Sequence, residues 1–305
     1  MSFSKKLKQK LRSGLSFLHR DRPAILGFLF HGLFEDREEI AANHVDAQQA
    51  ITREQMRLFI EIFLEAGYDF ISPEQEDSKL TTTGKYACIT FDDGYANNLR
   101  MVALLEEYDI PATFYITTGN VEQQECFWWD VVYRERIRRG AQKTDISREQ
   151  KMLKEKHHLD IITYLLREFG DTCLLPWSDT DRPMTIEELK EFSAHPLVHI
   201  GNHTRNHYLL DQYGYSEILE QIQLAQIDIS NWTGRTPVSI AYPNGNYSPV
   251  AAKAAANSGL QRGLTLQKIK NHPPMDGNFQ IGRFTLWGNQ EIRTQCNVFR
   301  SDIPL

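Results

Sequence analysis

The order of apolar and polar positions predicts short strands that alternate with amphipathic helices from residue 24 onwards. Apolar runs typical of strands lie at 24–30, 68–72, 86–91, 112–117, 198–200, 238–241, 263–266 and 279–286. Apolar residues at helical spacing predict helices at about 52–67, 96–108, 216–232 and 248–259. This alternation is typical of a parallel sheet wrapped by helices, so we expect an α/β fold.

Local capping signals fix the ends of two of these helices. Thr52 and Gln55 form a capping-box pattern before the first helix, and Gly67 follows its last turn. Ser248 and Pro249 combine an N-cap residue with a proline at the first helical position. We therefore expect both helices to begin at these residues.

Residues 120–195 depart from the alternating pattern and are predicted to be mostly helical. No linker rich in proline, glycine or serine separates this stretch from its flanks. We interpret it as a helical insertion within one domain that spans residues 23–305.

Composition excludes several classes of protein. The 34 Lys and Arg against 40 Asp and Glu give a net charge of −6, which argues against a nucleic-acid-binding protein. No apolar run reaches the length of a membrane span. The four cysteines form no C-x-x-C pair, so we expect free thiols in a reducing compartment.

Residues 1–22 form a basic leader with seven Lys or Arg and one acidic residue. Its Phe and Leu residues recur at helical spacing, and lysines interrupt them, which a secretory signal peptide would not allow. One interpretation is a helix that lies on an anionic membrane surface. The alternative is a leading helix that packs on the domain.

Two adjacent carboxylates, Asp92 and Asp93, follow the strand predicted at 86–91 and precede Gly94. Catalytic groups of parallel α/β folds gather at the carboxyl ends of strands. One carboxylate can therefore bind a metal while the other meets a reactant, although Asp-Asp-Gly is also a common turn sequence.

Two histidines, His203 and His207, are four residues apart, the spacing at which imidazoles on one helical turn converge on one ion. A carboxylate and two histidines suit a hydrolytic centre of the zinc type. His199, on the strand that leads into this segment, is interpreted as structural.

Three motifs follow predicted strands in order: Thr90-Phe-Asp-Asp-Gly94, His203-Thr-Arg-Asn-His207 and Tyr242-Pro-Asn-Gly245. Over about residues 24–286 the chain resembles the polysaccharide deacetylase family with the NodB homology domain, carbohydrate esterase family 4. This resemblance implies a distorted (β/α) barrel with fewer than eight strands. It also implies a divalent metal ion, with zinc expected first and cobalt, nickel or iron as alternatives.

The resemblance assigns roles to the motif residues, position by position. It implies that Asp92 is the catalytic base, that the metal ligands are Asp93, His203 and His207, and that Thr204 steadies the histidine loop. In the third motif it implies that the main-chain N–H of Asn244 faces the oxyanion, with Tyr242 beside it at the substrate.

Two departures from the family pattern lead to further expectations. The Leu-x-His motif that supplies the general acid in most relatives is absent. His31 ends the first strand, as in the branch of the family with a permuted domain, and we expect it to be the acid in preference to His272. Ala241 stands where many relatives have an arginine, so we expect Arg283 to orient Asp92.

The segment Phe127-Trp-Trp-Asp130 opens the insertion and suggests a sugar-binding surface. Indole rings stack on the apolar faces of sugars, so Trp128 or Trp129 could line a groove in which Asp130 accepts hydrogen bonds from hydroxyl groups. The alternative is that these aromatic residues pack in a core.

The sequence thus predicts a metal-dependent hydrolase that removes acetyl groups from N-acetylated sugars of a glycan or glycan precursor. A hydrolase of another amide or of O-acetyl esters, and a glycan-binding module without catalysis, are the alternatives. We expect a cytoplasmic protein, peripheral to the membrane if residues 1–22 bind it.

Overall fold

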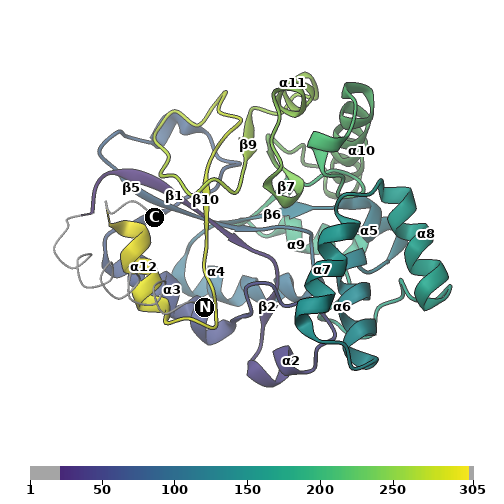
Figure 1. The fold of residues 1–305 in the computed structure, drawn as a ribbon. Coiled ribbons are helices and arrows are strands. Elements are labelled where there is room, and N and C mark those ends of the chain that lie inside the picture. Colours follow the sequence, from purple (N-terminus) through teal and green to yellow (C-terminus); the bar gives the residue numbers. More distant parts are fainter. Residues whose placement is uncertain (1–20, 302–305) are drawn as a thin grey trace.

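The computed structural model describes residues 21–301, so the amphipathic residues of the predicted leader lie outside the described part of the chain. A parallel sheet curls into a nearly closed barrel with helices around it (Figure 1). Its seven strands follow the order β10 (Arg283–Thr285), β1 (Ala24–Phe30), β5 (Lys85–Phe91), β6 (Ala112–Ile116), β7 (Val198–Asn202), β8 (Ser239–Ala241) and β9 (Arg262–Leu264). The expected distorted (β/α) barrel with fewer than eight strands is confirmed.

Backbone pairing explains how the barrel approaches closure. Leu264 of β9 pairs with Ile281, just before β10, and β10 in turn pairs with β1. Gly282 breaks this edge because its N–H and its carbonyl both bind the side chain of Asn271. The predicted strand at 279–286 is therefore reduced to the short β10.

Smaller strands and the helices complete the fold. A short β4 (Asp69–Phe70) pairs with β5, and β2 (Leu33–Phe34) pairs with β3 (Ile51–Thr52). The helices are α2 (Arg37–Ala41), α3 (Arg53–Glu65), α4 (Met101–Tyr108), α5 (Thr118–Gln123), α6 (Trp128–Arg138), α7 (Lys143–Leu153), α8 (His158–Phe169), α9 (Ile186–Ala194), α10 (Tyr215–Thr233), α11 (Pro249–Asn257) and α12 (Ile292–Arg300). Within residues 21–301, none of these helices is long and apolar enough to span a bilayer.

The two capping predictions are confirmed. The Thr52 hydroxyl accepts from the Gln55 N–H and the Gln55 side chain accepts from the Thr52 N–H, at the start of α3. The Ser248 side chain accepts from the Ala251 N–H, and Pro249 is the first residue of α11. Local sequence thus decides where these helices begin.

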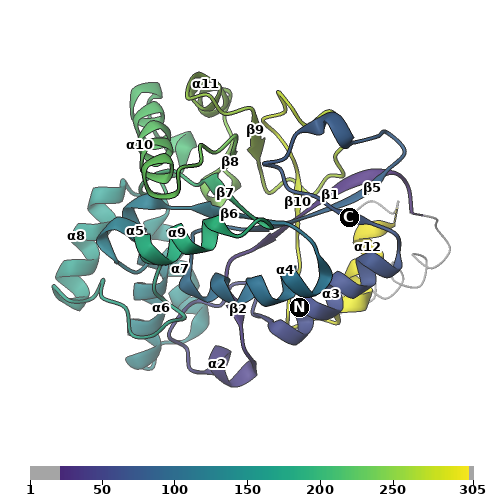
Figure 2. The same cartoon turned by 180° about the vertical axis from the view of Figure 1, so that it is seen from behind.

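Side chains alternate between the barrel interior and the helices around it, as the pleat of a strand requires. Ile25 of β1 belongs to an interior cluster with residues of β5, β6, β8 and β9. Phe28, three residues further along β1, faces outward and meets Phe59 and Phe63 of α3, with ring centroids 4.8 and 5.0 Å away. In the view from behind, α3, α4 and α9 cover this outer face (Figure 2).

The helices α6, α7 and α8 form a layer with an apolar cluster of its own. Val132, Leu153 and Leu165 are fully buried at its centre. By contrast, α9 packs on the main core through Leu189 and Phe192. The layer lies at one end of the sheet (Figure 1), where its residues can reach the space beyond the strand ends.

Candidate active site

Three inward-facing positions carry functional groups at the carboxyl ends of their strands. In β5, Tyr86 and Cys88 face the barrel interior, and the same alternation brings Asp92 to that side just after the strand. The same alternation applies to His31 after β1 and to His203 after β7. The strands therefore aim these three side chains at one space above the barrel.

Asp93 turns into this space because its backbone is left-handed, with φ of +79° before Gly94. Its Oδ1 lies 3.3 Å from Nε2 of His203 and 3.4 Å from Nε2 of His207. Both carboxylate oxygens are buried and have no hydrogen-bond partner among the described residues. Burial opposes ionisation, but the three nearby histidines, including His31, outweigh it and lower the pKa of Asp93 to about 2.

The two histidines converge through a loop, so the prediction of a helical turn is wrong. The backbone is left-handed at Thr204 (φ +66°) and at His207 (φ +52°), which breaks helical geometry between the rings. Nδ1 of His203 lies 2.7 Å from the carbonyl oxygen of Ala241, so it donates, and Nε2 faces Asp93.

The histidine loop is held mainly through its main chain. The Thr204 N–H donates to Oδ1 of Asn202, and its carbonyl accepts from the Thr118 N–H. The Thr204 hydroxyl is buried and has no partner in the described part of the chain. Burial lowers the pKa of His207 to about 3, so its imidazole is neutral, which is the form that can bind a metal.

A buried arginine holds Asp92. Arg283 of β10 donates from its two terminal nitrogens to the two carboxylate oxygens, at 2.7 and 2.8 Å, and one of them also donates to Thr90. Burial disfavours the charge of Asp92, but Arg283 and then His203 outweigh it and hold the pKa of the carboxyl below its usual value. The structure thus brings Arg283 to Asp92 from the opposite end of the sequence.

Gly27 leaves the space that this arginine needs. It pairs with Arg283 across β1 and β10, and a Cβ atom at Gly27 would lie 2.8 Å from the carbonyl oxygen of Gly282 and 3.1 Å from Cγ of Arg283. A larger residue would therefore displace the side chain that orients Asp92.

His31 lies across the site from the histidine loop. Its Nδ1 is 2.8 Å from Oε1 of Gln49, and its Nε2 is 3.9 Å from Oδ2 of Asp93. The side chain of Asn98 donates to the His31 carbonyl and fixes the end of β1. His272 is exposed on a distant loop and does not line the cavity described below.

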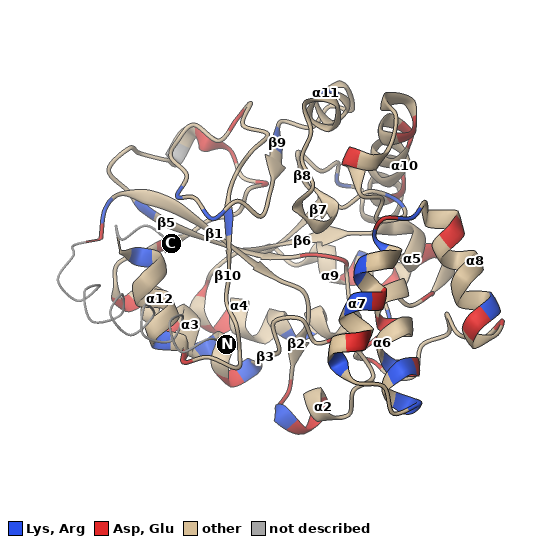
Figure 3. Cartoon of the chain, in the orientation of Figure 1, with Lys and Arg blue, Asp and Glu red and all other residues tan. Residues whose placement is uncertain are grey.

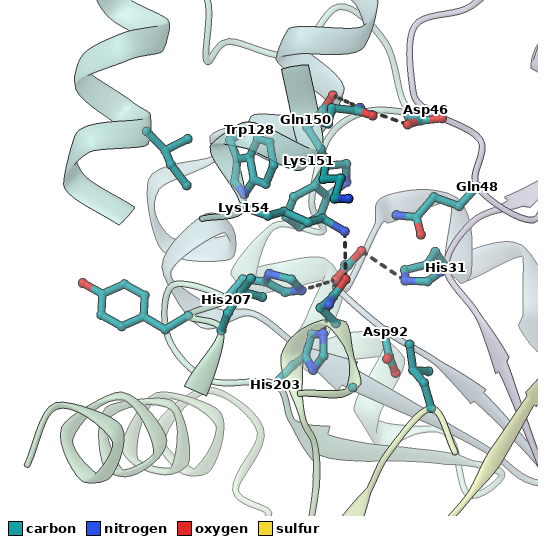
Figure 4. A pocket seen from close by; sticks show the side chains of 18 of the residues that line it. His31, Asp46, Gln48, Asp92, Trp128, Gln150, Lys151, Lys154, His203 and His207 are labelled. Atoms are coloured by element: carbon teal, nitrogen blue, oxygen red, sulfur yellow. Dashed lines mark hydrogen bonds and ion pairs between the residues drawn. The ribbon is translucent and has the colours of Figure 1, made fainter. Parts of the chain in front are cut away.

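A cavity of about 500 Å³ opens above these residues. Figure 4 shows His31, His203 and His207 turned toward a common centre, with Asp92 beside it. Trp128 and Trp129 form part of the wall contributed by the helical layer, and the Trp129 ring lies 4.7 Å from that of His207.

Two predicted substrate contacts are wrong. The carboxylate of Asp130 is fully buried beneath the wall, where it accepts from the Tyr95 hydroxyl at 2.6 Å and the Asp46 N–H at 2.8 Å. The ring of Tyr242 is fully buried in an apolar cluster with Leu210 and does not line the cavity. Neighbouring residues bury both side chains, so neither can contact a sugar in the cavity. Both instead support the residues around it.

Asn244 does line the cavity. Its backbone is left-handed (φ +56°) at the turn after β8, and its Oδ1 accepts from Nζ of Lys154 at 2.8 Å. Sequence reasoning did not find Lys154, which directly follows α7 and reaches the site only through the fold. Gln49, which binds His31, was missed for the same reason.

Comparisons with known proteins bear on the family and the fold. A family model described as polysaccharide deacetylase matches residues 79–263. No curated protein matches the chain.

Solved structures of deacetylases share the fold. The Streptococcus pyogenes deacetylase PplD, in complex with acetate, superposes with a TM-score of 0.61 at 17% identity, covering 91% of this chain and 99% of that one. IcaB from Ammonifex degensii superposes with a TM-score of 0.60 at 17% identity, covering 93% of this chain and 100% of that one. A de-N-acetylase from Aggregatibacter actinomycetemcomitans superposes with a TM-score of 0.61 at 18% identity, covering 90% of this chain and 99% of that one. Since the family model matches more than half of the residues, this chain belongs to the polysaccharide deacetylase family.

Proposed function

We propose that this protein is a metal-dependent deacetylase that removes the acetyl group from an N-acetylated sugar. The observation that carries the proposal is the cluster of Asp93, His203 and His207, whose ligand atoms all lie within 4.8 Å of one another. Asp92 and His31 flank this cluster on the wall of the same cavity.

The three ligand residues fit a divalent ion. A buried carboxylate without hydrogen-bond partners is costly, and a cation between Asp93 and the two histidines would offset that cost. The carbonyl of Ala241 orients His203 in the way that outer-shell partners orient metal-bound imidazoles. Such an ion would polarise the acetyl carbonyl and lower the pKa of a water molecule.

Asp92 acts as the general base in this proposal. Its carboxylate is held ionised by Arg283 and takes a proton from the attacking water. The bidentate contact fixes the orientation of the carboxylate, but it also lowers its basicity. Asp92 therefore owes its effectiveness as a base to its fixed position, since its pKa is low.

His31 donates the proton that the departing amine requires. Its Nε2 faces the metal ligands, and Gln49 holds the ring through Nδ1. The main-chain N–H of Asn244, at the rim of the same cavity, is assigned to the developing oxyanion. The acid and the oxyanion donor thus come from β1 and from the turn after β8.

Acetate release from N-acetylglucosamine oligomers tests the proposal. EDTA should abolish release, and zinc or cobalt should restore it. Asp92→Asn should retain stoichiometric zinc in the purified protein and lose turnover, whereas Asp93→Asn should lose both. Release that persists in EDTA, or an active Asp92→Asn variant, would contradict these roles.

A further inference from the structure

Three lysines line the cavity from one end of the helical layer. Lys151 lies in the last turn of α7, Lys154 follows that helix directly, and Lys156 lies in the loop before α8. Figure 4 shows the side chains of Lys151 and Lys154 extending toward the space between His31 and His207. Composition does not explain this group, because the chain as a whole has a net charge of −6.

These lysines have no acidic partner in the described part of the chain. No carboxylate oxygen there lies within 4.0 Å of any of the three ammonium groups, and Lys154 donates to the amide oxygen of Asn244. Elsewhere in the same layer acidic and basic residues are interspersed (Figure 3). Arg136, for example, binds Glu149 at 2.8 Å and Glu168 at 2.9 Å. Among the described residues, the three lysines at the cavity therefore lack a direct ion-pair partner, whereas Arg136 of the same layer has two.

The acidic residues of the cavity already have other partners. Asp92 binds Arg283, and Asp93 faces the histidines. Asp46 accepts a hydrogen bond from Nε2 of Gln150 at 3.0 Å. None of these three carboxylates thus forms an ion pair with the lysines within 4.0 Å, although Asp46 keeps its charge because Gln150 is a neutral donor.

Lys154 carries a cost that an anion would offset. Burial lowers its pKa, although the charges of Asp46 and Asp93 oppose that shift. The only direct partner of this partly buried ammonium group is a neutral amide, and the charges of Asp46 and Asp93 offset its lost hydration only in part. An anionic ligand beside Lys151, Lys154 and Lys156 would supply this counter-charge.

We propose that the sugar substrate carries an anionic group, a phosphate or a carboxylate, and that Lys151, Lys154 and Lys156 bind it. This inference rests on the proposed deacetylase function and narrows its substrate class. Lysine ammonium groups act as point charges, which suits a phosphate or carboxylate approached from several directions. An oligomer of N-acetylglucosamine alone offers these residues no charged group.

Three substrates test the charge requirement. Acetate release is compared for N-acetylglucosamine 1-phosphate, for oligosaccharides of N-acetylglucosamine and glucuronic acid, and for the neutral methyl glycoside of N-acetylglucosamine. At low salt, kcat/KM for one anionic substrate should exceed that for the neutral one by about tenfold, as expected for a few partly exposed ion pairs. Raising NaCl to about 0.5 M should shrink this preference by screening. The better anionic substrate tells whether phosphate or carboxylate is recognised.

Lysine variants test the residues. The double variant Lys151→Gln with Lys156→Gln should raise KM for the preferred anionic substrate by about tenfold and leave kcat nearly unchanged. Lys154 is kept, because its contact with Asn244 would confound the result. Lys190→Gln, at an exposed lysine of α9 away from the cavity, is the matched control and should leave KM unaltered.

The outcomes separate this inference from the proposed function. Equal kcat/KM for neutral and anionic substrates, or an unchanged KM in the double variant, would overturn the inference while acetate release upholds the deacetylase. If the metal-loaded protein releases acetate from none of the three substrates, both the proposed function and the inference fail.

Discussion

The pair of Arg283 and Asp92 makes the most direct prediction, because both charged side chains are buried. Replacing Arg283 by Met keeps much of the side-chain volume and removes the guanidinium that binds both carboxylate oxygens at 2.7 and 2.8 Å. For two unit charges about 4 Å apart at an effective dielectric constant of about 20, the lost attraction is about 4 kcal/mol. This agrees with the roughly 3–5 kcal/mol expected when one partner of a buried pair is removed.

The loss should depend on pH. In the natural protein the pKa of Asp92 is below its usual value. The pair therefore stabilises the fold fully at a pH above the pKa that Asp92 has in the unfolded chain, and this stabilisation is lost as the pH falls from there through the lower pKa of the folded state. Without Arg283, burial raises the pKa of Asp92. The variant is then more stable with Asp92 protonated than with Asp92 ionised. The destabilisation caused by Arg283→Met should therefore be larger at about pH 8 than at about pH 5.

Urea unfolding at the two pH values measures this effect, in EDTA and in zinc, with acetate release measured in parallel. Adding Asp92→Asn to Arg283→Met should recover part of the stability, with a coupling energy of about 3 kcal/mol. Arg293→Met is the control, since Arg293 is exposed and lies 3.8 Å from Glu65, and it should change stability by less than about 0.5 kcal/mol. If Arg283→Met unfolds like the natural protein at both pH values, our account of Asp92 is incorrect.

Three further changes probe other parts of the site and barrel. His31→Ala should lower kcat by roughly 100-fold or more with zinc content unchanged, and an unaltered kcat would remove His31 as the acid. Gly27→Ala should cost about 1–3 kcal/mol of stability and reduce kcat, because its Cβ would press on Arg283; a variant with natural stability and activity would contradict this close approach. Glu74 accepts from the Ser239 N–H at 2.8 Å, and burial raises its pKa to about 7, so its contribution to stability should fall as pH rises from about 4.5 to 7. Urea unfolding measures this fall as a decrease, of roughly 3 kcal/mol between these pH values, in the free energy of unfolding of the natural protein relative to the Glu74→Gln variant. A relative free energy that stays constant with pH would refute it.

Local sequence was sufficient for the α/β class and for several of its strands and helices. The alternation of strands and helices predicted the parallel sheet, and the capping residues at Thr52 and Ser248 marked helix starts that the structure confirms. These features depend on neighbouring residues only, through side-chain periodicity and hydrogen bonds to the nearby backbone.

The conformation of the histidine motif was not predictable in this way. A spacing of four suggested a helical turn, but left-handed residues at Thr204 and His207 bring the rings together instead. Hydrogen bonds from distant segments hold this loop, including one from the Thr118 N–H to the Thr204 carbonyl. Spacing along the chain therefore identified the two histidines but did not predict the backbone conformation between them.

The sequence by itself determined the chemical groups: the paired carboxylates, the two histidines and a histidine at the end of the first strand. Only the tertiary structure decided which side chains meet. It paired Asp92 with Arg283, 191 residues away, buried Asp130 under Tyr95, and brought Lys154 to Asn244. The physical reason is that strand ends from the whole chain converge at one end of a barrel, so each side chain's partners are set by sheet order and burial, which no local pattern encodes.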